Sequence, residues 1–179
     1  MNNDNKVCQK DISLTSLREL NQKKAFELVD FASMRQTMVG CAESCTGGLL
    51  AAYITSISGS SACMQGGIVS YACSVKHNVL GVEQAILDSV GAVSSECAFQ
   101  MAEGAAAVLE ADVAVSITGI AGPSGAVPGK PVGTVWFGIA TGDRIQTHIK
   151  HFDGTRSQVR EQSVSFALDL LLEAVHNCD

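Results

Sequence analysis

One short stretch of the chain, A-E-S-C-T-G-G at residues 42–48, combines a hydroxyl, a thiol and bare backbone. It follows an apolar segment, 37–42, that has the length of a buried strand, and it precedes an apolar segment, 49–57, that reads as a helix. Hydroxyl and thiol groups are nucleophiles in covalent catalysis, and backbone N–H groups at the start of a helix stabilise negative charge. The stretch therefore predicts a site for a nucleophile or an anion, with Ser44 as the candidate and Cys45 as its rival. Ser44 can also be read as a helix cap.

Three further side chains are candidates for the same site. Tyr71 ends an apolar strand predicted over 66–71, and Lys76 lies in a short helix predicted over 73–80. Arg156 stands at the first position of the last predicted helix, where the positive end of the helix dipole disfavours a cation unless an anion is bound there. The alternatives are a core tyrosine with its hydroxyl at the rim, a solvated lysine and a solvated arginine.

Composition and motifs argue against several classes of protein. A net charge of −6 disfavours binding to the phosphate backbone of a nucleic acid. Seven cysteines without C-x-x-C or zinc spacing indicate a reducing compartment and no structural metal. The glycine-rich loop at 119–131 lacks the spacing of a dinucleotide or nucleotide triphosphate site, so no cofactor is expected. Without a signal peptide or an apolar run of ~20 residues, we expect a cytoplasmic protein that does not interact with membranes.

Alternating strand and helix patterns define the expected fold. A polar tail is predicted over 1–14 and a single domain over 15–179. Strands are expected near 38–42, 66–71, 112–118, 132–140 and 145–152, and the remaining helices over 16–36, 95–110 and 156–175. Ser94 is expected to cap one helix, Thr155 and Gln158 to form a capping box at another, and Gly142-Asp143 to turn a hairpin. The pattern predicts an α/β class, a three-layer α/β/α sandwich with a mostly parallel, mixed sheet.

In such sheets ligands bind beyond the carboxyl ends of the strands. The loops that qualify are 43–48, 72–76 and 119–131, together with the start of the last helix at 153–156. We therefore expect the candidate side chains to meet at one edge of the sheet.

Several separated blocks of the chain resemble the carboxyl-terminal domain of the CinA, or competence/damage-inducible, family. The blocks are A-E-S-C-T-G-G-L-L-A-A-Y-I-T, G-S-S-A-C-M-Q-G-G-I-V-S-Y-A-C-S-V-K-H-N-V-L-G-V and S-I-T-G-I-A-G-P-S-G with G-K-P-V-G-T-V-W-F-G-I-A. Stand-alone members of this family are nicotinamide-nucleotide amidases. The resemblance thus implies hydrolysis of nicotinamide mononucleotide to nicotinate mononucleotide and ammonia, in pyridine nucleotide salvage.

The resemblance also implies roles for individual residues. Family active sites use a serine and a lysine with a tyrosine nearby, which carry over to Ser44, Lys76 and Tyr71. Backbone amides around Thr46 and Gly47 are expected to hold the oxyanion. Further substrate contacts carry over to Arg156 and to the loop Thr118, Gly119, Ile120, Ala121 and Gly122.

Two motifs depart from the family pattern. The usual Y-S-N-E-A-K reads Y-A-C-S-V-K at 71–76, and the usual G-D-R reads G-T-R at 154–156. Two alternatives to an enzyme therefore stay open: a nucleotide-binding module that has lost catalysis, and a protein-interaction domain. We also expect a homo-oligomer, a dimer or higher.

Overall fold

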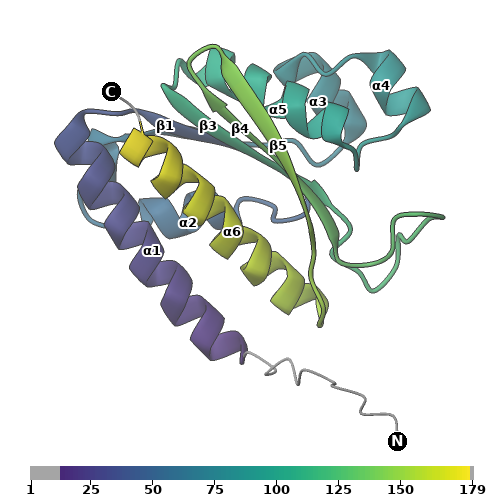
Figure 1. Ribbon diagram of the computed structural model, residues 1–179, viewed down its shortest axis with the longest axis horizontal. Helices are drawn as coiled ribbons and strands as arrows, with labels where there is room; N and C mark the ends of the chain where they lie inside the picture. Colours follow the sequence, from purple (N-terminus) through teal and green to yellow (C-terminus); the bar gives the residue numbers. More distant parts are fainter. Residues whose placement is uncertain (1–12, 178–179) are drawn as a thin grey trace, which may run out of the picture.

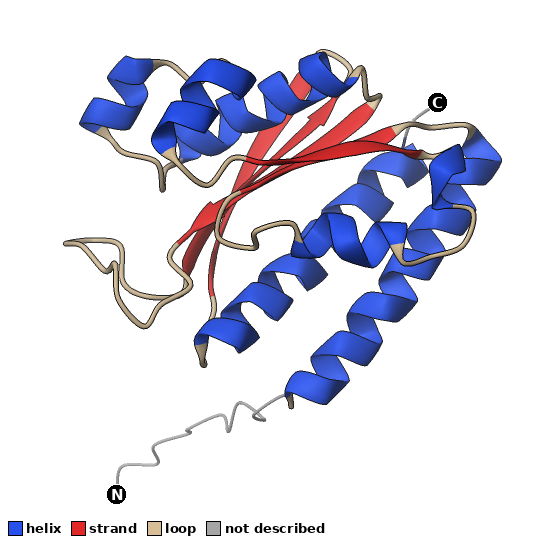
Figure 2. Ribbon diagram, turned by 180° about the vertical axis from the view of Figure 1, so that it is seen from behind, coloured by secondary structure: helices blue, strands red, loops and turns tan. Residues whose placement is uncertain are grey.

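The computed structural model describes residues 13–177, which form a five-stranded sheet covered by helices on both faces (Figures 1 and 2). The predicted α/β sandwich is confirmed. The strands are β1 (Val39–Glu43), β2 (Met64–Val69), β3 (Val113–Gly119), β4 (Thr134–Thr141) and β5 (Arg144–His151). The helices are α1 (Leu14–Arg35), α2 (Leu49–Thr55), η1 (Ser60–Ala62), α3 (Cys73–Leu80), α4 (Gln84–Ser89), α5 (Ser95–Leu109) and α6 (Arg156–Asn177).

The strand order β2-β1-β3-β4-β5 decides where the loops meet. β1 pairs in parallel with both β2 and β3, whereas β4 is antiparallel to its two neighbours. β1, β2, β3 and β5 therefore run in the same direction, and their carboxyl ends lie at one edge of the sheet. The predicted hairpin joins β4 to β5, with Gly142 in the left-handed region (φ 54°) that favours glycine.

The two faces of the sheet carry side chains of different size. Helices α1, α2 and α6 cover one face, and α3, α4 and α5 lie on the other (Figure 1). Val113, Val115 and Ile117 of β3 face the first group, while Ala114 faces α5. Because successive side chains of a strand point to opposite faces, alternation of large and small residues lets α5 approach the sheet more closely than α6.

A glycine shows how close that approach is. A Cβ atom at Gly138 of β4 would clash with the carbonyl oxygen of Ala98 in α5. The hydroxyl of Ser116 lies in the same contact, donating to the Ala98 carbonyl (2.6 Å) and accepting from the Gly138 amide (3.0 Å). The strand and the helix are thus joined by polar groups where no side chain fits between them.

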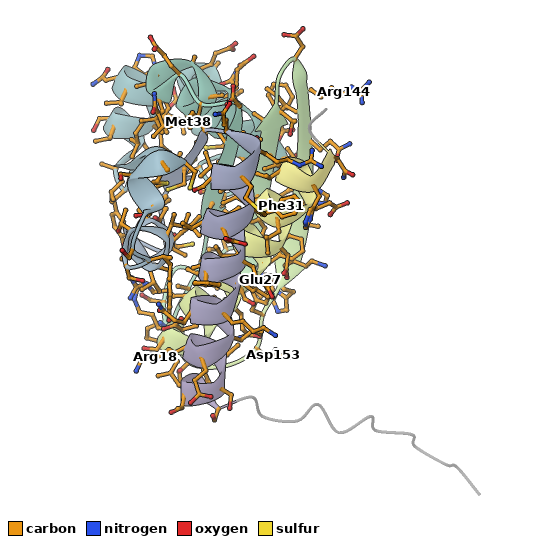
Figure 3. The ribbon with its side chains drawn as sticks, turned by 90° about the vertical axis from the view of Figure 1, so that its left-hand side faces the viewer. Arg18, Glu27, Phe31, Met38, Arg144 and Asp153 are labelled. Atoms are coloured by element: carbon orange, nitrogen blue, oxygen red, sulfur yellow. The ribbon has the colours of Figure 1, made fainter. Side chains whose placement is uncertain are left out.

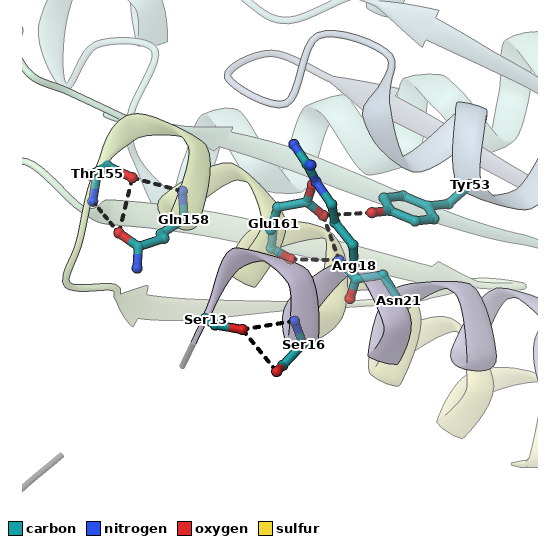
Figure 4. Close-up of polar contacts among 8 residues, drawn as sticks. All are labelled: Ser13, Ser16, Arg18, Asn21, Tyr53, Thr155, Gln158 and Glu161. Carbon is teal, nitrogen blue, oxygen red and sulfur yellow. Dashed lines mark hydrogen bonds and ion pairs between the residues drawn. The ribbon is translucent and has the colours of Figure 1, made fainter. Parts of the chain in front are cut away.

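Predicted helix ends agree with the structure in detail. Ser94 accepts a hydrogen bond from the amide of Cys97 (3.2 Å), as a helix cap does. Thr155 and Gln158 form the predicted capping box: the Thr155 amide donates to Gln158 Oε1 (2.8 Å), and the Gln158 amide donates to Thr155 Oγ1 (3.4 Å; Figure 4). Both α5 and α6 therefore begin where local sequence signals place them.

Other boundaries were not foreseen. α1 begins at Leu14 with Ser13 as its cap, inside the predicted tail of 1–14, whose first twelve residues lie outside the described part of the chain. The prediction also missed η1 and α4. η1 has three residues and α4 has six, and α4 buries none of them, so neither is long enough to show the apolar spacing of a helix.

A buried carboxylate ties α6 to its two neighbours. α1 lies beside α6 (Figure 3). Glu161 of α6 accepts from Arg18 Nε (3.1 Å), Asn21 Nδ2 (2.9 Å) and the hydroxyl of Tyr53 in α2 (2.8 Å; Figure 4). Burial, with help from this carboxylate, raises the pKa of Tyr53 to about 12. The network fixes the amino-terminal half of α6, which carries Arg156 and Arg160.

Within residues 13–177, no helix combines the length and apolar character needed to cross a membrane.

Candidate active site

A cavity of about 300 Å³ lies at the carboxyl edge of the sheet. Its walls come from the turn after β1, the residue two places after β2, the loop after β3 and the first residue of α6. The lining residues are Ser44, Cys45, Tyr71, Gly119, Ile120, Ala121, Gly122, Ser124, Gly125 and Arg156. Loops expected to meet at this edge therefore do meet there, because four of the strands end on the same side.

Ser44 and Lys76 are in direct contact behind this cavity. Ser44 follows the last residue of β1, and its amide donates to the carbonyl of Ile117 in β3 (2.9 Å). Lys76 projects from α3, and its Nζ lies 2.9 Å from Ser44 Oγ. The same Nζ also contacts the backbone carbonyls of Ser70 and Tyr71. Backbone groups thus hold both partners of the pair in place.

The environment of Lys76 differs from that of a surface lysine. Only 1% of the residue is exposed, so the alternative of a solvated helix charge is wrong. Burial lowers its pKa from the ordinary value of 10.5, because a charged amine loses hydration in the interior; the thiols of Cys97, Cys73 and Cys45 oppose this shift. A lysine with a lowered pKa is more often neutral, and a neutral amine accepts a proton.

Glu43 caps the helix that follows the Ser44 turn, a role that the sequence analysis did not assign. Its carboxylate is 1% exposed and accepts from the amides of Gly48 (3.0 Å), Leu50 (3.1 Å) and Ala51 (2.9 Å). The reading of Ser44 as the helix cap is therefore wrong. The sequence signal for this cap is a carboxylate shortly before an apolar helix, and it was not used in the sequence analysis.

The turn itself has few uncommitted amides. Gly47 and Gly48 both adopt positive φ (60° and 90°), which glycine does without strain. The Gly47 amide donates to the Ser44 carbonyl (3.1 Å), and Gly47 does not line the cavity. Among the amides of residues 44–51, those of Cys45 and Thr46 lack a bond to another described residue. Only Cys45 of these two lines the cavity, because Thr46 is fully buried, so the oxyanion role expected of Thr46 and Gly47 fits the Cys45 amide instead.

Tyr71 lines the cavity but is not a core residue. It is 62% exposed, so the alternative of a buried ring with its hydroxyl at the rim is wrong. Its backbone carbonyl accepts from Lys76 Nζ (3.3 Å), whereas its hydroxyl makes no hydrogen bond with any described residue. Tyr71 therefore presents an aromatic surface to the cavity.

The loop after β3 forms the opposite wall. Gly119, Ile120, Ala121 and Gly122 line the cavity, as expected. Thr118 does not: it is buried, and its hydroxyl donates to the carbonyl of Ala92 (2.7 Å). It points to the same face of the sheet as Ala114 and Ser116, towards α5, and it is not among the residues that line the cavity, so the structure does not bring it to the expected substrate contact.

Arg156 lies at the mouth of the cavity, on the first turn of α6. Its Nη1 donates to the carbonyl of Gly122 (2.9 Å), and the rest of the guanidinium is exposed. The backbone amides of Arg156 and Ser157 make no hydrogen bond with other described residues. A charged fork and two free amides at a helix start are suited to an anion.

A second arginine of α6, which the sequence analysis missed, lies beneath the Ser44 turn. Arg160 follows Arg156 by one helical turn, and its Nη2 donates to the carbonyl of Thr46 (2.6 Å). The spacing of four residues places both on one face of the helix, and this spacing is the sequence signal for a second arginine near the site.

The thiol of Cys45 is a weak nucleophile, although it lies next to Ser44 in the chain. Burial raises the pKa of Cys45 to about 11, with Glu43 adding to the shift and Lys76 and Arg160 opposing it. At neutral pH this thiol is protonated, which weakens it as a nucleophile.

Within residues 13–177, no group of three or more His, Cys, Asp or Glu side chains is arranged to hold a metal ion.

Fold and site together define an α/β protein with a serine–lysine pair at the carboxyl edge of a mixed sheet. Residues 21–175 match the family model of the CinA C-terminal domain, and the chain belongs to this family.

Relatives of the chain have several names. It is 50% identical over 135 residues to a nicotinamide-nucleotide amidohydrolase PncC of Enterobacter agglomerans, covering 75% of this chain and 82% of that protein. It is 44% identical to a CinA-like protein of Mycolicibacterium gilvum, covering 90% of this chain but only 40% of that longer protein. The crystal structure of a CinA superfamily protein from Klebsiella pneumoniae superposes with a TM-score of 0.85 at 34% identity, covering 88% of this chain and 99% of the other.

Proposed function

We propose that this protein hydrolyses the carboxamide of nicotinamide mononucleotide, producing nicotinate mononucleotide and ammonia. The observation that carries the proposal is the 2.9 Å contact between Lys76 Nζ and Ser44 Oγ at the wall of the cavity. The relative from Enterobacter agglomerans, named as a nicotinamide-nucleotide amidohydrolase, supports the choice of substrate.

Lys76 acts as the general base. A neutral amine has two N–H groups and one lone pair, and the carbonyls of Ser70 and Tyr71 accept the two N–H groups. The lone pair is then free to accept the Ser44 proton. A pyridinium ring bound beside the amine also disfavours its protonation, because like charges repel.

Ser44 acts as the nucleophile. Its oxygen attacks the carboxamide carbon while its proton passes to Lys76, and the amide of Cys45 stabilises the oxyanion. Lys76 returns the proton to the departing nitrogen, which leaves as ammonia. Water then attacks the ester bond to Ser44, and its proton restores the serine hydroxyl as nicotinate mononucleotide is released.

The two ends of the cavity suit the two ends of the substrate. Tyr71 offers its ring face to the cationic pyridinium. Arg156, at the mouth of the cavity, binds the 5′-phosphate together with the free amides of α6. The mononucleotide thus spans the distance from the serine to the start of α6.

The departures from the family pattern lie outside the cavity wall, although the thiol of Cys73 is near enough to Lys76 to oppose the lowering of its pKa. Cys73 and Ser74 are exposed, and Thr155 caps α6 through Gln158. None of these three residues lines the cavity. These positions favour an enzyme over the two alternatives, a degenerate nucleotide-binding module and a protein-interaction domain.

An ammonia-release assay with nicotinamide mononucleotide tests the proposal. We expect release of one ammonia per nicotinate mononucleotide by the wild-type protein and none by Ser44→Ala. Binding of the nucleotide without release of ammonia would instead support the binding module, and absence of both would support the interaction domain.

A further inference from the structure

Arg160 is a charged residue in an unusual position. Its Nη2 donates to the Thr46 carbonyl, while its Nε is buried and has no hydrogen-bond partner among residues 13–177. No carboxylate in this part of the chain pairs with it, and the adjacent Glu161 is bonded to Arg18, Asn21 and Tyr53 instead. An unpaired, partly desolvated charge is destabilising. Stability alone therefore does not explain an arginine at this position.

Its one side-chain hydrogen bond within residues 13–177 is made to the turn that carries Ser44. The Thr46 carbonyl also accepts from the amide of Leu49 (3.3 Å), so the bond from Arg160 joins the turn, the start of α2 and the side of α6. Thr46 is fully buried, and it directly follows Cys45, whose amide is the uncommitted N–H group at the cavity wall beside Ser44. Fixing the carbonyl of Thr46 restricts the backbone of the turn, and hence the direction of the Cys45 amide.

We infer that Arg160 is a positioning residue for Ser44 catalysis, which holds the Thr46 backbone so that the amide of Cys45 points at the developing oxyanion. This inference rests on the proposed function. The guanidinium also places a fixed positive charge behind the turn, where negative charge develops during attack. Preorganised dipoles and charges of this kind stabilise the transition state more than the bound substrate.

The two arginines of α6 then have different effects on the kinetics. Arg156 lines the cavity and reaches the substrate, whereas Arg160 does not line it and acts through the turn. Loss of Arg156 should therefore weaken substrate binding. Loss of Arg160 should lower kcat and leave KM nearly unchanged, because it removes an interaction that matters mainly in the transition state.

The test compares Arg160→Met and Arg160→Lys with Arg144→Met, at an exposed arginine of β5 outside the cavity. With nicotinamide mononucleotide, we expect Arg160→Met to lower kcat about 10- to 100-fold, with KM within about threefold. Arg160→Lys should recover part of the loss, because an ammonium can donate to the Thr46 carbonyl but lacks the fork. Arg144→Met should keep the wild-type kcat. If circular dichroism shows that Arg160→Met does not fold, the kcat of Arg160→Lys is compared with that of the wild type instead.

A second measurement separates this inference from the proposed function. A fluorophosphonate reacts with activated serines and forms an oxyanion-like adduct, so its labelling of Ser44 requires no nucleotide. We expect Arg160→Met to be labelled at least tenfold more slowly than wild type, and Arg156→Met at nearly the wild-type rate. If the wild-type protein releases no ammonia but Arg160→Met is still labelled more slowly than wild type, only the proposed function is overturned. The positioning role is overturned if Arg160→Met has the wild-type labelling rate and kcat, or if it changes KM without changing kcat. It is also overturned if the wild-type protein is neither labelled nor active.

Discussion

The amine of Lys76 lies 2.9 Å from the hydroxyl oxygen of Ser44, although 32 positions separate the two residues in the chain. β1 and β2 are adjacent and parallel, so the turn after β1 and the helix after β2 begin at the same edge of the sheet. The pair is therefore a direct product of strand order. Each partner is further fixed by backbone groups, which leaves little freedom in the distance between them.

Removal of either partner of this pair should abolish most of the amidase activity. We expect Ser44→Ala and Lys76→Met each to lower kcat by about 1,000-fold or more, and the double variant to be little worse, because the two residues act as one unit. Cys45→Ala should retain kcat within about threefold, since that thiol is protonated at neutral pH. Ammonia release measures all four variants. An inactive Cys45→Ala beside an active Ser44→Ala would reverse the assignment of the nucleophile.

The lowered pKa of Lys76 predicts how activity depends on pH. The neutral amine is the active form, so kcat/KM should rise with pH and level off with a midpoint below 10.5, the ordinary lysine value. A profile with its midpoint at or above 10.5 would contradict a buried lysine base.

The same shift predicts a pH dependence of stability. A lysine whose folded pKa is lowered binds more protons in the unfolded state, so its contribution to the free energy of unfolding increases as pH rises from the lowered pKa towards 10.5. Urea unfolding of wild type and Lys76→Met should therefore diverge in favour of wild type over that range. Parallel curves for the two proteins would show that the lysine titrates normally.

Arg156 should distinguish substrates with and without a phosphate. We expect Arg156→Ala to lower kcat/KM for nicotinamide mononucleotide about ten- to a hundredfold, as loss of a charge-assisted hydrogen bond does, and to affect nicotinamide riboside hardly at all. Arg156→Lys should recover only part, because a point charge does not reproduce the guanidinium fork. Equal losses for the two substrates would make Arg156 a structural residue that holds the Gly122 loop.

Glu43 should matter for stability as well as for activity. Glu43→Ala removes the carboxylate that accepts from three amides, and we expect the free energy of unfolding to fall by about 3 kcal/mol. Glu83→Ala, at an exposed position, should change it by less than about 0.5 kcal/mol. Urea unfolding measures both. A Glu43→Ala protein as stable as the control would mean that water can replace this cap.

Tyr71 should act through its ring and not through its hydroxyl. Because the hydroxyl has no partner among the described residues, Tyr71→Phe should keep most of the wild-type kcat/KM. Tyr71→Leu should raise KM for the cationic mononucleotide about fivefold, as expected for loss of about 1 kcal/mol of cation–π attraction. A large fall in kcat in Tyr71→Phe would instead place the hydroxyl in the proton transfer.

Much of this molecule follows from local patterns in the sequence. The strands, most of the helices and the caps at Ser94 and Thr155 depend on the order of apolar and polar residues and on side chains within four positions of each other. The loops that form the site were also identifiable, since the carboxyl ends of parallel strands meet at one edge. Ser44 and Arg156 were candidates for the same reason, because their residue types and their positions at the ends of elements can be read from the sequence. Lys76 was given its role only by the resemblance to the CinA family.

What the tertiary structure decided is the environment of each side chain. Lys76 has no feature in the sequence that separates it from an exposed helical lysine, because its burial is supplied by residues of other elements. Arg160 contacts Thr46 across 114 positions, and Thr118 turns away from a loop whose neighbouring residues line the cavity. Burial, pKa and the direction of a side chain depend on neighbours that are distant in the chain, and those neighbours are determined by how helices pack on the sheet and not by any local pattern.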